Sequence, residues 1–275
     1  MDAYSTAEIA ALVGGLLAAS VLGGLLAGLL GVGGGIVIVP ALFWLFTLVK
    51  FDPALSMHMA VATSLATIVA TSISSARAHH KKGGVDADLL RRWAPFMAFG
   101  ALAGGLGAKF IDPAGLKAIF GVIALLVAAN LATPKTLVVA QSLPASRAGQ
   151  GGIATFIGGL SALMGIGGGT LSVPILAAFS YPIRRAVGTA AAFGFVIAVP
   201  AAIGFVIAGW GVPDRPPLSL GYVSVPAALL ILPVTTFCAP YGARLAHAVD
   251  PIWVKRAFAL FLGITAFRML SAAFG

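Results

Sequence analysis

The sequence has very little charge for its length. Asp, Glu, Lys and Arg make up 9% of the 275 residues, whereas a soluble domain carries about a quarter. Hydrophobic residues make up 60%, and the mean hydropathy is +1.04. Windows such as 9–49 and 153–183 hold no charged residue, and roughly 20 apolar residues suffice to cross the hydrocarbon core. The composition excludes a soluble globular domain and predicts an all-α polytopic membrane protein.

Cysteine and buried acidic residues are also scarce. Cys238 is the single cysteine, which excludes an internal disulfide and a cysteine metal cluster, and we expect no metal and no cofactor. No Asp or Glu falls deep inside an apolar segment, which argues against a carboxylate proton relay or a cation pump. Paired carboxylates within the segments and an H-E-x-x-H motif are missing too. We therefore expect that the protein is not an enzyme.

Positive charge is absent from the beginning of the sequence, since no Lys or Arg precedes Lys50. A secretory signal peptide starts with positive charge, so we expect no cleaved signal and a multi-pass protein of the inner (plasma) membrane. The formal net charge is nevertheless +9. Because the basic residues fall at the ends of the apolar segments, they favour a role in topology and contacts with membrane lipids over nucleic-acid binding.

The sequence contains an internal repeat. The stretch LLGVGGGIVIVPAL (29–42) has a second copy, LMGIGGGTLSVPIL (163–176), in which the glycines and the proline match at a constant offset. We predict a tandem duplication within one membrane domain, with a first repeat over 1–135 and a second over 136–275. Two further pairs follow in the same order: AVATS (60–64) with AVGTA (186–190), and GAKFIDP (107–113) with GARLAHAVDP (242–251).

Each half divides into five apolar segments, which makes about ten in all. The second segment of each half is short, because 14 residues span about 21 Å as a helix, less than the roughly 30 Å of hydrocarbon. These two short segments follow the G-x-G-G-G motifs and are either tilted or re-entrant. The predicted segments are 8–30, 36–49, 56–77, 88–109 and 114–132 in the first half, and 150–166, 170–180, 185–209, 220–243 and 251–272 in the second.

The distribution of basic residues decides between two orientations of the halves. If the short segments cross the membrane, the halves are inverted and only five of the 17 basic residues share the less basic side. If they do not cross, the two sides hold 9 and 8 basic residues. Since basic residues gather on the cytoplasmic side, the uneven split favours two homologous inverted repeats with both termini outside. The five minority residues are Lys50, Lys109, Lys117, Arg215 and Arg268.

Three consecutive glycines in each repeat lie among aliphatic residues. A dinucleotide-binding loop is excluded, because the spacing is not G-x-G-x-x-G and no βαβ unit surrounds it. Close helix packing through small residues is one remaining interpretation. The other is a helix break whose backbone N–H groups bind an anion, as paired broken helices do in secondary transporters. The candidate residues are Gly33, Gly34, Gly35, Gly167, Gly168 and Gly169, with Pro40 and Pro174 as structural breaks inside the short segments.

Hydroxyl groups near these glycines are candidate donors to the same anion. Thr170 directly follows the second glycine motif, Thr63 and Ser64 lie in the third segment, and Thr189 is the repeat mate of Thr63. A Ser or Thr in a helix often bonds its own backbone instead, so this alternative stays open for Thr63 and Thr189. We expect a small anionic solute that is moved by alternating access with protons as the coupling ion. A passive anion channel is the alternative.

With these motifs the sequence resembles the TauE/SafE family of membrane permeases, the sulfite exporters. The resemblance rests on the two glycine motifs with their prolines, on AVATS and AVGTA, on the HHKKGGVD loop (79–86) and on PYGARLAH (240–247). It covers nearly the whole chain. It implies a permease that exports sulfur oxyanions such as sulfite or organosulfonates, or other small organic anions. That substrate class comes from the resemblance, whereas the residues alone indicate an anion.

Overall fold

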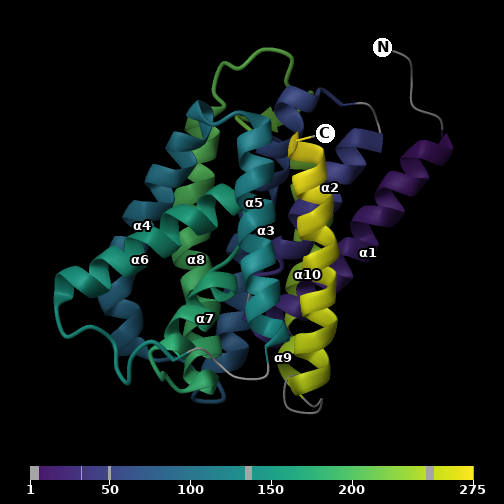
Figure 1. Ribbon diagram of the computed structural model, residues 1–275. Coiled ribbons are helices and arrows are strands. Elements are labelled where there is room, and N and C mark those ends of the chain that lie inside the picture. The colour runs from purple at the N-terminus through teal and green to yellow at the C-terminus, as the bar shows by residue number, and fades with distance from the viewer. Residues whose placement is uncertain (1–5, 32, 49–50, 134–137, 246–250, 275) are drawn as a thin grey trace.

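The computed structural model shows a bundle with ten α-helices among the residues that it describes (Figure 1). It describes residues 6–31, 33–48, 51–133, 138–245 and 251–274. The α-helices are α1 (Thr6–Leu30), α2 (Gly35–Leu48), α3 (Pro53–His80), α4 (Ala87–Gly107), α5 (Pro113–Ala132), α6 (Arg147–Met164), α7 (Gly169–Ala178), α8 (Ile183–Ala208), α9 (Val225–Leu245) and α10 (Pro251–Phe274).

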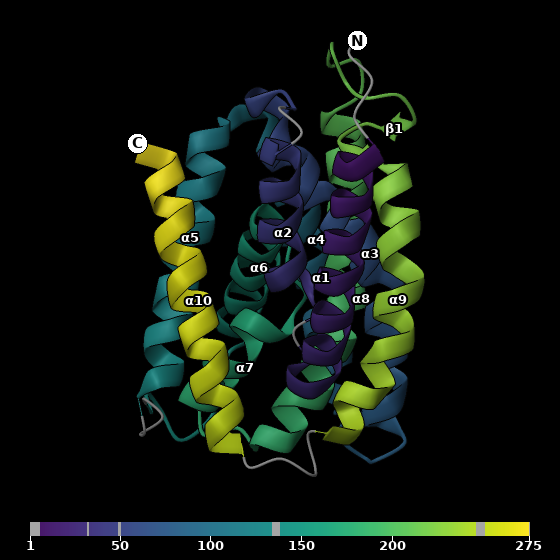
Figure 2. The same ribbon diagram turned by 90° about the vertical axis from the view of Figure 1, so that its right-hand side faces the viewer.

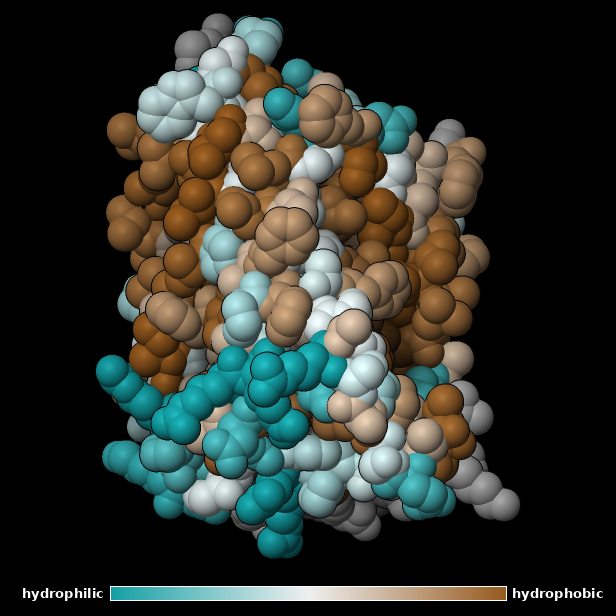
Figure 3. All heavy atoms as spheres, turned by 90° about the vertical axis from the view of Figure 1, so that its left-hand side faces the viewer, coloured by the Kyte–Doolittle hydropathy of each residue, from teal (hydrophilic) through white to brown (hydrophobic). Residues whose placement is uncertain are grey.

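Six of these helices, α1, α3, α5, α8, α9 and α10, are long and apolar enough to cross a membrane. The apolar helices α2 and α7 have only 14 and 10 residues and correspond to the two segments predicted to be short. Figure 3 shows one face of the bundle as a broad hydrophobic band, with hydrophilic side chains gathered at one end. The protein is therefore a helical membrane protein.

Aspartate and proline set where two of the long helices start. Asp52 caps α3 and Asp112 caps α5, each through a side-chain oxygen that accepts a backbone N–H, at 2.8 and 2.7 Å. A proline follows each aspartate at the start of the helix, where its missing N–H would have no helical partner anyway. These Asp-Pro pairs explain why both helices begin within three residues of the predicted segments.

A short hairpin precedes α9 and corrects one predicted boundary. β1 (Ser219–Leu220) pairs antiparallel with β2 (Val223–Ser224), and Gly221 between them has φ +56°, a left-handed conformation that glycine adopts without strain. The apolar residues at the beginning of the predicted segment 220–243 thus belong to the hairpin. The helix itself starts at Val225. A 3₁₀ helix, η1 (Ala108–Phe110), lies between α4 and α5.

The described chain starts and finishes at the same end of the bundle. α1 begins there, α10 ends there and the β1–β2 hairpin lies there, whereas residues 138–146 and the α3–α4 loop lie at the opposite end (Figures 1 and 2). We name the first the hairpin end. The second is named the basic end, because the loop and the helix starts found there carry Lys81, Lys82, Arg91, Arg184 and Arg256.

The main helix pairs join the two halves of the chain rather than staying within one half. α1 packs on α9, and in the same way α6 packs on α4. α3 packs on α9 while α8 packs on α4, and the remaining large contacts join α3 with α8 and α5 with α10. Helices in the same place in the two halves therefore have partners in the same place, and each half depends on the other for its core.

Glycines allow the closest of these crossings. On α1, a Cβ added to Gly24 would lie 2.7 Å from the carbonyl oxygen of Thr235 on α9. On α4, a Cβ added to Gly104 would lie 2.6 Å from the carbonyl oxygen of Gly159 on α6. Backbones can approach this closely only where the side chains are small, which is how helices gain packing contacts in lipid.

Candidate functional site

The first glycine motif interrupts the chain between α1 and α2. Gly33 and Gly34 have φ +75° and +79°, a left-handed conformation that residues with a Cβ rarely adopt. The carbonyl oxygen of Gly34 then accepts the N–H groups of Val37 and Ile38 at 3.1 and 3.2 Å, which starts α2. Helix α2 therefore begins inside the protein, and the N–H groups of Gly35 and Ile36 at its start have no preceding helical carbonyl to bind.

The second motif makes a similar interruption with a different backbone. α6 ends at Gly165 with φ +67°, and its N–H bonds back to Ala162 and Ser161. Gly168, by contrast, has φ −60° and serves as the N-cap of α7, accepting the N–H of Ser172 at 2.9 Å. The two motifs share the left-handed backbone at their first glycine, Gly31 at φ +68° and Gly165 at +67°, but differ further along, where Gly34 is left-handed and its repeat mate Gly168 is not.

The two interruptions lie against each other in the interior. A Cβ added to Gly33 would lie 3.0 Å from the Cα of Gly167, and one added to Gly35 would collide with the carbonyl oxygen of Gly165. The Ser64 hydroxyl of α3 donates to the same Gly165 carbonyl at 2.8 Å. The structure thus brings five glycine and serine residues from both halves together, at the starts of two helices.

The two prolines do not end the short helices. Pro40 and Pro174 each occupy the sixth position of α2 and α7, and both helices continue beyond them. The interruptions of the helical chain lie at the glycines that precede each helix, and the role of the two prolines as structural breaks inside the short helices stays a prediction. A proline near a helix start removes only a single intrahelical bond, which a packed helix tolerates.

Buried hydroxyl groups without a partner surround the second motif. Thr170 and Ser172 of α7 and Ser161 of α6 are at most 2% exposed, and none of their hydroxyls has a hydrogen-bond partner among the described residues. Buried polar groups are almost always hydrogen-bonded, so each exception needs an explanation. At the repeat positions of Thr170 and Ser172 the first motif has Ile36 and Ile38, so these side-chain donors are confined to one half.

Thr63 and Thr189 have protein partners, and the partners correspond. The Thr63 hydroxyl of α3 accepts the N–H of Ser224, just before α9, at 2.9 Å. The Thr189 hydroxyl of α8 accepts the N–H of Asp86, just before α4, also at 2.9 Å. Each threonine therefore holds the start of the fourth helix of the other half. Neither bonds its own helix through these contacts, in contrast to the alternative left open by the sequence.

A charged cluster at the basic end joins the two halves; we name it the Asp86 cluster (Asp86, Tyr181 and Arg185). Tyr181 donates a short hydrogen bond to the Asp86 carboxylate, and Arg185 lies 3.6 Å from it. The Tyr181 hydrogen bond, followed by the N–H of Leu89, lowers the pKa of Asp86. Burial, reinforced by that carboxylate, raises the pKa of Tyr181 to about 12. Sequence analysis missed this cluster, because nothing in the sequence pairs residues 95 positions apart.

Replacing Asp86 by Asn is expected to lower the free energy of unfolding at pH 7 by about 1 kcal/mol, because hydrogen bonds to a charged acceptor are stronger than neutral ones. The pKa of Asp86 is lower in the folded state, so its contribution is present at neutral pH and is lost as the pH falls through that lowered pKa. Denaturation in detergent at pH 7 and in acid would measure both effects.

The matched control is Asp88→Asn, two residues further on. The Asp88 side chain is 86% exposed and its ion pair with Arg91 spans 3.9 Å, so we expect no measurable change. An Asp86→Asn variant as stable as Asp88→Asn at pH 7 would contradict the role given to the cluster.

Comparison with known proteins now adds to this geometry. A family model described as sulfite exporter TauE/SafE matches residues 16–269. The chain belongs to this family. Three relatives from distant organisms, each named a probable membrane transporter protein, match most of its length. No solved structure matches the chain significantly.

The relatives differ in how similar they are to this chain, but all three are named probable membrane transporter proteins. That of Haemophilus influenzae is 37% identical over 250 residues, covering 90% of this chain and 94% of the relative. That of Methanocaldococcus jannaschii is 27% identical, covering 90% and 91%. YunE of Bacillus subtilis is 28% identical, covering 70% and 78%. This TauE/SafE protein is accordingly a membrane transporter of a small solute and not an enzyme.

Proposed function

We propose that this transporter moves a small oxyanion, sulfite or an organosulfonate, and binds it between the starts of α2 and α7. The observation that carries this proposal is the pair of buried hydroxyls of Thr170 and Ser172 in the first turns of α7, neither of which has a hydrogen-bond partner in the part of the chain that the structure describes. A helix start presents backbone N–H groups and the positive end of the helix dipole. Hydroxyl donors beside such a start form the environment that an oxyanion requires.

The backbone of the glycine motifs supplies the other donors in this proposal. They are Gly33, Gly34 and Gly35 before and at the start of α2, and Gly167, Gly168 and Gly169 at that of α7. Ser64, Thr63 and Thr189 belong to the wall of the site: Ser64 fixes the carbonyl of Gly165, and the two threonines fix helices α9 and α4. No metal or other cofactor takes part in this mechanism.

We further propose that residues 1–135 and 136–275 are inverted repeats, and that groups of helices drawn from both repeats move relative to each other in alternating access. The corresponding helix pairs and the matching Thr63 and Thr189 hydrogen bonds support this symmetry. The positive-inside rule assigns the basic end to the cytoplasm of the inner membrane and both termini to the outside. In alternating access, the Asp86 cluster closes the cytoplasmic end, and export requires it to open.

The test is sulfite flux into proteoliposomes made with the purified protein. We expect flux that saturates with sulfite and follows an imposed pH gradient, because a carrier with protons as coupling ion has a limited number of sites. Protein-free liposomes give the background. A passive anion channel, the second candidate, would instead show conductance that an imposed pH gradient does not drive. If neither sulfite nor an organosulfonate showed saturable flux or conductance, the proposed substrate class would be refuted.

A further inference from the structure

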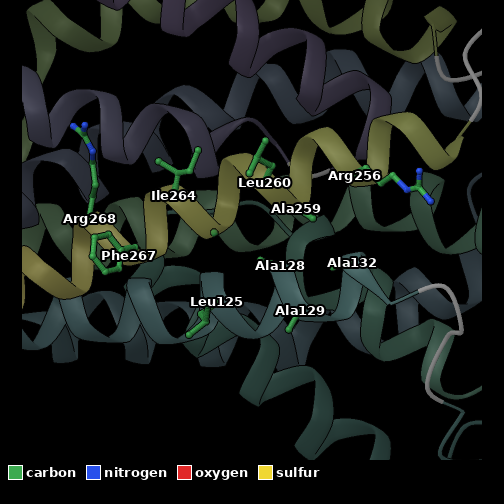
Figure 4. A pocket seen from close by; sticks show the side chains of 11 residues that line it. Leu125, Ala128, Ala129, Ala132, Arg256, Ala259, Leu260, Ile264, Phe267 and Arg268 are labelled. Atoms are coloured by element: carbon green, nitrogen blue, oxygen red, sulfur yellow. The ribbon is translucent and has the colours of Figure 1, made fainter.

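A groove runs between α5 and α10 on the outer surface, and no residue of the glycine motifs lines it (Figure 4). It has a volume of about 730 Å³, within the range of about 300–1,000 Å³ typical of ligand sites. Small residues form its floor: Ala128 and Ala132 of α5, and Ala259 and Gly263 of α10. A Cβ added to Gly263 would meet no atom within 4 Å, so the groove is open at its middle.

The walls of the groove are apolar and face outward. Leu260 and Phe267 are 67% and 73% exposed, as expected of side chains that contact acyl chains in a membrane protein. The groove is thus continuous with the lipid-facing surface, and its contents come from the bilayer rather than from water.

The two ends of the groove are both marked by arginine. Arg256 lies at the basic end, near the start of α10, and Arg268 lies twelve residues further on, about 18 Å along the helix. The Arg268 guanidinium lies 5.6 Å from the centre of the Trp44 ring of α2, and Figure 4 shows it extending away from α5. Arg256 is exposed and, of the described residues that line the groove, it is the cation nearest the basic end.

We propose that this groove binds one anionic phospholipid from the leaflet at the basic end. Its phosphate lies at Arg256, and an acyl chain runs along the small residues between α5 and α10. Basic sites between helices at a membrane surface attract anionic headgroups, and the apolar walls match a hydrocarbon chain. The groove therefore matches both parts of an anionic phospholipid: the arginine matches its charged headgroup, and the apolar walls match its acyl chain.

A second copy of the chain fits the groove less well. In a two-fold dimer with its axis along the membrane normal, each residue near the axis faces its own equivalent. The groove would then bring Arg256 against Arg256 and Arg268 against Arg268, and like charges placed together are unfavourable. An anionic lipid instead places its negative phosphate beside the positive charge of Arg256.

The test uses the full-length protein in detergent, with phosphatidylglycerol and phosphatidylcholine as probes and native mass spectrometry to measure bound lipid. We expect about fivefold tighter binding of phosphatidylglycerol, the effect of one basic residue near a membrane surface. Arg256→Gln should abolish this preference. Gly263→Leu should weaken binding of both lipids, because the new side chain fills the groove without meeting another atom at its Cβ.

Two variants outside the groove serve as controls and should bind both lipids like the parent. Arg91→Gln removes an exposed charge at the same end, and Gly152→Leu adds a leucine at an equally open helix position on α6. The proposal is overturned if the parent binds the two lipids equally, or if the preference survives Arg256→Gln. A parent that is dimeric and becomes monomeric in Gly263→Leu would identify a copy interface instead. Transport is not measured, so the result is independent of the proposed substrate.

Discussion

The double variant Thr170→Val, Ser172→Ala is expected to bind sulfite at least about a hundredfold more weakly than the parent. Two hydrogen bonds to a charged ligand contribute about 1.5–3 kcal/mol each, and 3 kcal/mol corresponds to roughly a hundredfold in affinity. Both hydroxyls are buried and lack a partner among the described residues. Removing them should therefore leave the unfolding temperature unchanged or slightly higher, since no protein hydrogen bond is lost.

Titration calorimetry gives the sulfite affinity, and thermal unfolding in detergent checks that the variant is folded. Thr71→Val is the matched control, because the Thr71 hydroxyl is also buried but donates to Thr235 at 2.8 Å. It should lose stability by about 1 kcal/mol and keep its affinity. A double variant that binds and transports sulfite like the parent would leave the α7 hydroxyls without the proposed role. Leucine at Gly168 would be less informative, because a Cβ there would lie 2.6 Å from Phe193 and disturb packing.

The second large effect concerns stability. Gly28→Ala on α1 should lower the free energy of unfolding by about 3 kcal/mol or more, since overpacking a close contact costs about 1–3 kcal/mol and rigid backbone cannot move aside. A Cβ added to Gly28 would collide with the carbonyl oxygen of Ala239 and lie 2.6 Å from the nitrogen of Ala243, both on α9. The helices would have to separate along the crossing that joins the two halves.

Gly14→Ala on the same helix is the control. A Cβ there meets nothing within 4 Å, and alanine favours a helix over glycine by about 1 kcal/mol, so this variant should be at least as stable as the parent. Thermal unfolding of both variants, with the fraction of monodisperse protein after purification, separates the two outcomes. Equal stability of Gly28→Ala and Gly14→Ala would show that the α1–α9 crossing is looser than the structure indicates.

The helices and the meeting of the two glycine motifs were predictable for a simple physical reason. A helix that crosses the membrane must be apolar over the length that lies in the hydrocarbon core. Uncharged segments of the sequence therefore predict the helices, with small errors at the helix ends. The glycine motifs stand out because three glycines destabilise any helix they interrupt, and their repetition pointed to one shared place. Thr170, expected from the sequence as a donor beside the second motif, is buried at the start of α7, and its role in binding stays a prediction.

Other parts of the site depend on contacts that no local pattern encodes. Thr63 and Thr189 each accept an N–H group at the start of the fourth helix of the other half. These bonds cannot be predicted without knowing which helix starts lie near each threonine. The hydrogen bond from Tyr181 to Asp86 cannot be predicted either, because only the fold brings these two residues together. The unequal backbone of the two glycine motifs is likewise invisible, because glycine permits both conformations and the neighbouring helices decide between them.

The helices of each half pack mainly on helices of the other half, and this has a consequence for synthesis. A ribosome completes α1 long before α9 exists, and α5 long before α10. The first half must therefore wait in the bilayer with its interior surfaces covered only by lipid or by membrane chaperones. The core closes late, when the C-terminal helices arrive, so premature termination anywhere before α9 would leave a product that quality control can recognise.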